Sequence, residues 1–105
     1  MITVSILYPN QEGSTFDLDY YCNTHIPMTE EKLAPALKGV RIESGVNGGL
    51  RDSQPPYLAI GHLLFDSLEA FIEAFTPHAK VLQGDIPNYT NIKPVIQISE
   101  VKISR

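Results

Sequence analysis

The sequence contains one cysteine and only eight lysine or arginine residues. Cys22 therefore has no second cysteine with which to form an internal disulfide or a structural zinc site. The basic residues are scattered along a chain of net charge −4, and no run of them could follow a phosphate backbone. We expect no nucleic-acid partner, and the lone cysteine favours the reducing cytoplasm as the location.

Long apolar runs are also missing, so we expect no segment that spans a bilayer and no membrane partner. The first ten residues, MITVSILYPN, lack the basic start and the small-residue cleavage site of a secretion signal. No repeat, linker or low-complexity stretch divides the 105 residues. A chain of this length with 43% hydrophobic and 19% charged residues is typical of one folded domain, which we expect over residues 1–105.

The pattern of apolar residues, turn formers and helix caps along the chain predicts six elements in the order β-α-β-β-α-β. Strands are expected at residues 1–8, 40–46, 57–65 and 95–104, and helices at residues 16–37, with an interruption, and 68–82. Gly39 and Gly84 follow the two helices as stop signals. This order is the split pattern of a ferredoxin-like α+β sandwich with a four-stranded antiparallel sheet.

The strand at residues 57–65 is apolar on both faces, although an antiparallel sheet with one wet face should alternate. One face of this strand carries Tyr57, Ala59, Leu63 and Phe65. The opposite face carries Leu58, Ile60 and Leu64. The last strand places Ile96 and Ile98 on one face, and Val95, Val101 and Ile103 on the other. Two helices cover only one face, so we predict a homodimer in which a second copy covers the other. The alternative is that the additional apolar residues are scattered on the surface.

The segment FDLDYYCNTHIPMTEEKL, residues 16–33, contains the candidate catalytic residue. At 100° per residue, one stripe of this helix holds Leu18, Cys22, His25 and Thr29, with Tyr21 at its edge. His25 should therefore face the sheet, where a partly buried imidazole could transfer protons. Pro27 lacks an N–H and disfavours helical angles at Ile26, so a bend or break is expected beside His25. The alternative is a hydrogen-bonded core histidine and a proline that only shapes the turn.

Two other histidines are candidate binding residues. His78 follows Pro77 at the edge of the apolar stripe of the second helix, so both helices carry a proline and a histidine near their inner faces. For His78 itself the pattern favours a surface position. His62 lies on the third strand and could line a cavity or the dimer interface. The three histidines lie on different elements without ligand spacing or a carboxylate partner, so we expect no metal site.

Four segments are distinctive in combination. They are LYPN at the end of the first strand, FDLDYYCNTHIP in the first helix, PPYLAIGHLLFDSLEAF, and the closing PHAKVLQGDIPNYTNIKPVIQISEV. Together they resemble the EthD family, named for an ethyl tert-butyl ether degradation protein, within the dimeric α+β barrel superfamily. The helix matches that family's FD-x-x-YY-x-x-x-H-x-P pattern, which places His25 and Pro27 on its most distinctive positions. Asp85, Pro87 and Asn88 also lie at matching positions, whereas APALKG departs from the Leu-Pro-Gly turn of many members.

The resemblance implies a homodimer of ferredoxin-like chains, each with a pocket between helices and sheet. Relatives in the superfamily include cofactor-independent monooxygenases, lactone isomerases and polyketide cyclases. Family membership determines a fold better than a reaction.

Our first hypothesis is an enzyme that needs no cofactor and acts on an apolar, aromatic or lactone-like metabolite. His25 would be its acid or base, and Tyr21, with His78 and His62, would bind the substrate. The second hypothesis is a non-catalytic binding or accessory protein of a degradation pathway. A third is a dimeric scaffold without a ligand.

Overall fold

A four-stranded antiparallel sheet forms one layer of the computed structural model, which describes all of residues 1–105. Its strands are β1 (Ile2–Pro9), β2 (Gly39–Ser44), β3 (Tyr57–Phe65) and β4 (Val95–Glu100). The spatial order is β2-β3-β1-β4, so β1 lies between the third and fourth strands of the chain. The predicted ferredoxin-like arrangement is confirmed.

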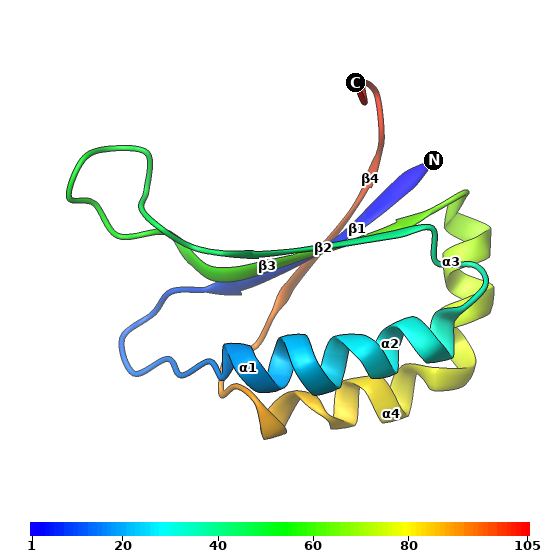
Figure 1. Cartoon of the computed structure of the whole chain (residues 1–105), viewed down its shortest axis with the longest axis horizontal. Coiled ribbons are helices and arrows are strands. Elements are labelled where there is room, and N and C mark those ends of the chain that lie inside the picture. The colour runs from blue at the N-terminus through cyan, green and yellow to red at the C-terminus, as the bar shows by residue number, and fades with distance from the viewer.

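The helices form the second layer and lie on one side of the sheet (Figure 1). The first helical segment comprises α1 (Leu18–Tyr20), the π-helical turn η1 (Tyr21–His25) and α2 (Ile26–Leu33). The second comprises α3 (Leu68–Phe75), η2 (Thr76–His78), α4 (Ala79–Gly84) and the short η3 (Ile86–Asn88). No helix is long and apolar enough to cross a membrane.

The bend expected beside Pro27 is replaced by the π-helical turn that precedes it. Ile26 keeps helical angles of φ −66° and ψ −45°, so the predicted departure from helical geometry at this residue is wrong. The N–H of Ile26 bonds to the carbonyl of Tyr21, five residues back, and this wider turn lets the chain pass the proline without a break. The segment then ends at Leu33, earlier than predicted, because Ala34 is extended in front of Pro35.

The wider turn also changes which residues face the sheet. The buried residues are Tyr21, His25, Ile26, Thr29 and Leu33. Cys22, which regular α-helical spacing placed on the inner stripe, is exposed instead. The prediction that His25 faces inward is confirmed, while the same prediction for Cys22 is wrong because one turn holds an additional residue.

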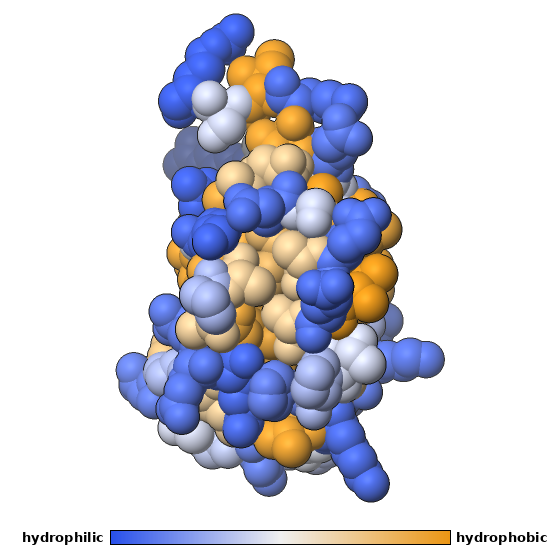
Figure 2. Space-filling model, turned by 90° about the vertical axis from the view of Figure 1, so that its right-hand side faces the viewer, coloured by the Kyte–Doolittle hydropathy of each residue, from blue (hydrophilic) through white to orange (hydrophobic).

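The burial of side chains alternates along strand β3, although both of its faces are apolar. Ala59, Leu63 and Phe65 are buried under the helices, whereas Leu58, Ile60, His62 and Leu64 lie on the helix-free face and are partly buried. The core has two clusters along the sheet: Val4, Leu33, Leu63, Phe65 and Leu82 form one, and the other centres on three buried tyrosines. Seen from the α3 end, hydrophobic side chains gather in the middle of the molecule, with hydrophilic ones beside and below them (Figure 2).

The last strand is shorter than predicted. It ends at Glu100, so Val101 and Ile103 do not belong to it, although the Val101 N–H donates to the carbonyl of Met1 at 3.0 Å. Ile96 and Ile98 pair with Ile6 and Val4 and therefore lie on the helix side of the sheet. They are 54% and 42% exposed because the helix layer does not reach this edge strand.

Candidate functional site

A cavity of about 470 Å³ lies between the helices and the sheet. Its wall comprises 18 residues, 13 of them hydrophobic, contributed by β1, β3, β4, all the longer helices and the loop before β4. Val4, Ile6 and Leu63 supply the sheet side, and Phe71, Phe75 and Leu82 the side of the second helical segment. A cavity of this size with a few polar groups suits a small, mostly apolar molecule.

His25 is the candidate proton-transfer group in this wall. It is buried, with 8% exposure, and the π-helical turn holds it there. Its Nδ1 atom lies 2.9 Å from Oδ2 of Asp85, a residue that follows α4. The Nε2 atom has no hydrogen-bond partner in the chain, so a ligand in the cavity is its available partner.

The carboxylate of Asp85 is held by three donors. It accepts hydrogen bonds from the Tyr20 hydroxyl at 2.7 Å, the Asn88 amide at 2.9 Å and the His25 ring. Burial raises the pKa of Asp85, but the bonds from Asn88, His25 and Tyr20 together outweigh it and hold the pKa below its ordinary value of 3.8. The carboxylate is therefore ionised at neutral pH and can only accept, so Nδ1 carries a proton and Nε2 is the nitrogen that can exchange a proton with a ligand.

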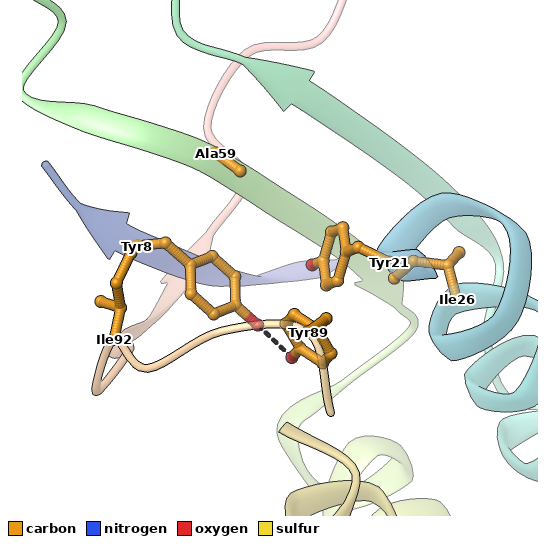
Figure 3. Packing of buried hydrophobic residues seen from close by; sticks show 6 residues of the cluster. All are labelled: Tyr8, Tyr21, Ile26, Ala59, Tyr89 and Ile92. Atoms are coloured by element: carbon orange, nitrogen blue, oxygen red, sulfur yellow. Dashed lines mark hydrogen bonds between the residues drawn. The ribbon is translucent and has the colours of Figure 1, made fainter. Parts of the chain in front are cut away.

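An aromatic cluster surrounds the histidine. The hydroxyls of Tyr8 and Tyr89 are hydrogen-bonded at 2.7 Å beneath β1 and β3, as Figure 3 shows. The ring of Tyr21 is parallel to His25 within 13° at a centroid distance of 5.6 Å, and the Tyr89 ring lies 4.8 Å from it. Burial raises the pKa of Tyr8, Tyr21 and Tyr89 well above the ordinary value, so these phenols stay neutral.

The hydroxyl of Tyr21 is buried and has no hydrogen-bond partner. It lies against the backbone of Gly61 on β3, where a Cβ atom would be only 2.6 Å away. The missing side chain at Gly61 therefore makes room for this hydroxyl. The hydroxyl is enclosed against β3, so Tyr21 contributes its ring, not its hydroxyl, to the cavity wall.

Loop contacts fix Tyr89 at the cavity. The backbone N–H of Asp17 donates to the Tyr89 carbonyl at 2.7 Å. Asn91 accepts from the Thr15 N–H and donates to the Gly13 carbonyl, each at 2.9 Å. These bonds tie the loop before the first helix to the loop before β4, so the two loops hold one end of the cavity together.

Of the predicted site residues, His25 and Tyr21 come together in the cavity, and His62 and His78 do not. His62 lies on the helix-free face, with its ring nitrogens 3.1 Å from Ser5 Oγ and 3.0 Å from Glu43 Oε1. His78 is half-buried beside a separate depression next to Pro35 and Pro77. No three His, Cys, Asp or Glu side chains are grouped where they could hold a metal ion.

Sequence reasoning missed Asp85 as the partner of His25. The only signal for it was its matching position in the closing segment that resembles the EthD family. Asn88, which bonds to the same carboxylate, carried the same signal, and Tyr20 lies in the matched helix pattern, but neither was predicted as a site residue.

A scan of family models and a search of curated proteins each found no match. Solved structures do match. An EthD-like protein from Ralstonia eutropha JMP134 is 40% identical over 99% of this chain and 94% of its own, with a TM-score of 0.94. An ethyl tert-butyl ether (EthD) family protein from Bacillus halodurans C-125 has the same fold, with a TM-score of 0.74 at 21% identity over 97% and 99% of the two chains.

Proposed function

This chain belongs to the EthD-like family, and from that premise we propose that it is an enzyme in which His25 moves a proton on a small, mostly apolar substrate. The observation that carries the proposal is the pairing of His25 Nδ1 with Asp85 at 2.9 Å while Nε2 remains unpaired in the cavity wall. This arrangement sets the tautomer of the ring and directs its basic nitrogen to the ligand.

The chemical step follows from these groups. Nε2 takes a proton from an acidic C–H or O–H of the substrate, and the electron pair stays on the substrate as an enolate or phenolate. The imidazolium that forms keeps its Nδ1–H on the Asp85 carboxylate, which stabilises the positive charge. The Tyr21 ring, stacked on His25 in the cavity wall, would pack against the apolar body of the substrate.

The fate of the anion defines the reaction type. Return of the proton from Nε2 to another atom gives isomerisation. Attack of the anion on an internal carbonyl forms the ring bond, and the resulting alkoxide takes the proton back from Nε2. Molecular oxygen, as the oxidant, adds to a carbanion to form a C–O bond, and the peroxide takes the proton from Nε2 and loses water, which leaves one oxygen atom in the product. All three begin with the same proton transfer to His25.

The test compares two histidines of one chain. Ligands are first found by thermal shift, because a binder stabilises the folded state only. Among ligands that are turned over, His25→Gln should lower kcat by about 100-fold or more, the usual contribution of a general acid or base. His78→Gln, outside the cavity, is the matched control and should leave kcat within about twofold, as a surface substitution should.

The second candidate is a non-catalytic metabolite-binding or accessory protein of a degradation pathway. The observation that favours it is the largely apolar wall, which could hold a metabolite while His25 only forms a hydrogen bond. If ligands bind but none is turned over by the wild-type protein, and His25→Gln only weakens their binding, this second candidate replaces the first.

We also propose that the protein is a homodimer joined through the helix-free face of its sheet. That face carries the apolar residues Leu7, Leu58, Ile60, Leu64 and Val95. Val95 is 50% exposed, and the helices all lie on the opposite side of the sheet (Figure 1). A second copy, packed sheet to sheet across a two-fold axis, would remove this surface from water.

A further inference from the structure

The wall of the cavity is asymmetric in charge. Among its 18 residues, Lys93 is the only one with a permanent charge, and none is an aspartate or glutamate. The nearby carboxylate of Asp85 is outside the wall and is already bonded to Tyr20, Asn88 and His25. Because burial keeps the tyrosines neutral, the cavity has a positive charge at Lys93 with no opposing charge in its wall.

Lys93 itself is free to bind a ligand. It forms no ion pair and no hydrogen bond within the chain, in contrast to Lys102, which is paired with Glu100. Its backbone is nevertheless fixed on both sides. Ile92 is buried in the aromatic cluster, and Val95 begins β4 opposite Leu7. A flexible ammonium group is thus placed on a rigid segment at the exposed side of an apolar cavity.

We propose that the substrate of this cavity is an apolar carboxylic acid, bound as its anion, with the carboxylate at Lys93 and the apolar body against the sheet and helices. This inference rests on the proposed function, because it assumes that the cavity is the substrate site. A carboxylate is the acceptor that a lysine ammonium prefers, and the charged hydrogen bond is stronger than a neutral one. Gln83, also in the wall, carries an amide that makes no bond within the chain and can donate to a ligand in the cavity.

The structure also indicates how the rest of the acid is held. A volume of about 470 Å³ accommodates a body of one or two rings or a medium-length alkyl chain. His25, whose Nε2 has no partner in the chain, gives the body a second polar contact in the cavity wall. The ligand would therefore have its ionised group at the entrance and a neutral, polarisable group near His25.

Matched acids and amides test this inference. The probes are 2-naphthoate, 4-phenylbutanoate and octanoate, each with its primary amide, and the readouts are thermal shift and calorimetric Kd. Wild-type protein should bind at least one acid more tightly than its amide. Lys93→Met should weaken binding of that acid about 3- to 10-fold, and Lys93→Arg, which keeps the charge, should retain it. Binding of the amides should not change.

The matched control is Lys80→Met, an exposed lysine of α4 outside the cavity, which should leave acid binding unchanged. The inference is overturned if no acid stabilises the protein more than its amide, or if Lys93→Met has no larger effect than Lys80→Met. Failure of this inference is distinguishable from failure of the proposed function, because the inference is tested by acid binding and the proposed function by the turnover of the His25→Gln variant. A preference for acids that Lys93 controls would stand even if His25 proved non-catalytic.

Discussion

The Nδ1 atom of His25 lies 2.9 Å from Oδ2 of Asp85, although 60 positions separate the two residues in the sequence. The π-helical turn presents the ring, and the segment after α4 presents the carboxylate. The same carboxylate accepts from Tyr20 and Asn88, so its position is fixed independently of the histidine. In the proposed mechanism, this pair makes the buried histidine a directed proton acceptor.

Replacing Asp85 tests that role directly. Asp85→Asn removes the negative charge that stabilises the imidazolium. The asparagine amide can donate as well as accept, so the proton of the His25 ring need not be on Nδ1. We expect kcat to fall by about 100-fold or more, since a directed general base contributes that much. Nitrogen chemical shifts of His25 should show a change in tautomer without any ligand. Asn88→Ala keeps the carboxylate and should have a much smaller effect, and equal losses in both variants would contradict the assignment.

The lowered pKa of Asp85 predicts a dependence of stability on pH. The folded-state pKa is below the ordinary value of 3.8, so the unfolded chain binds this proton first as pH falls. The stabilisation is complete above the ordinary value and is lost as pH falls through the lower, folded-state value. Urea unfolding at pH 7, 4 and 3 should show wild type losing its advantage over Asp85→Asn at acid pH. A constant difference between the two proteins would show that the carboxylate charge is not involved.

Gly61 and Tyr21 should be coupled. In Gly61→Ala, the new Cβ would lie 2.6 Å from the Tyr21 hydroxyl, so the ring must shift, at a cost of about 1–3 kcal/mol of unfolding free energy. Tyr21→Phe removes an unpaired buried hydroxyl and should cost little. The double variant should recover most of the loss because the clashing atom is gone. Denaturant unfolding of all four proteins measures the coupling, and additive losses would disprove the contact.

If the helix-free face is the dimer interface, a charge introduced there should dissociate the dimer. Ile60→Glu places a carboxylate in the middle of that face beside Glu43, its partner on β2. Light scattering at micromolar concentration should show a monomer for this variant and a dimer for wild type. Ile72→Glu, on the exposed side of α3, is the matched control and should remain dimeric. A wild-type monomer, or two variants that behave alike, would exclude this interface.

Much of the fold was predictable because its signals are local. The apolar runs of the strands and the apolar stripes of the helices require only neighbouring residues, so the element order and the sheet were correctly predicted. The stop signal at Gly84 was misplaced, because Gly84 is the last residue of α4. The end of α2 was misplaced because Ala34 leaves the helix before Pro35, ahead of the glycine signal. The assignment of Cys22 to the inner stripe failed because helical spacing was taken as uniform, whereas Tyr21–His25 is a wider turn.

The site was only partly predictable. The inward position of His25 followed from its stripe, but Asp85 lies in a loop without periodicity, and only folding brings the two together. The alternation of β3 separated His62 from Gly61, yet it could not show which of the two faces the helices would cover. His62 therefore remained a candidate for the cavity until the structure placed it on the opposite side.

By itself the sequence determined the order of the elements, the two apolar faces of β3 and the inward direction of His25. These follow from backbone periodicity, which depends on residues a few positions apart. Only the tertiary structure decided that Asp85 would hold His25, that the hydroxyl of Tyr21 would lie unpaired against Gly61, and that Lys93 would be the one permanent charge of the cavity wall. Those relationships join residues distant in the chain, so the packing of the helical layer against the sheet determines them.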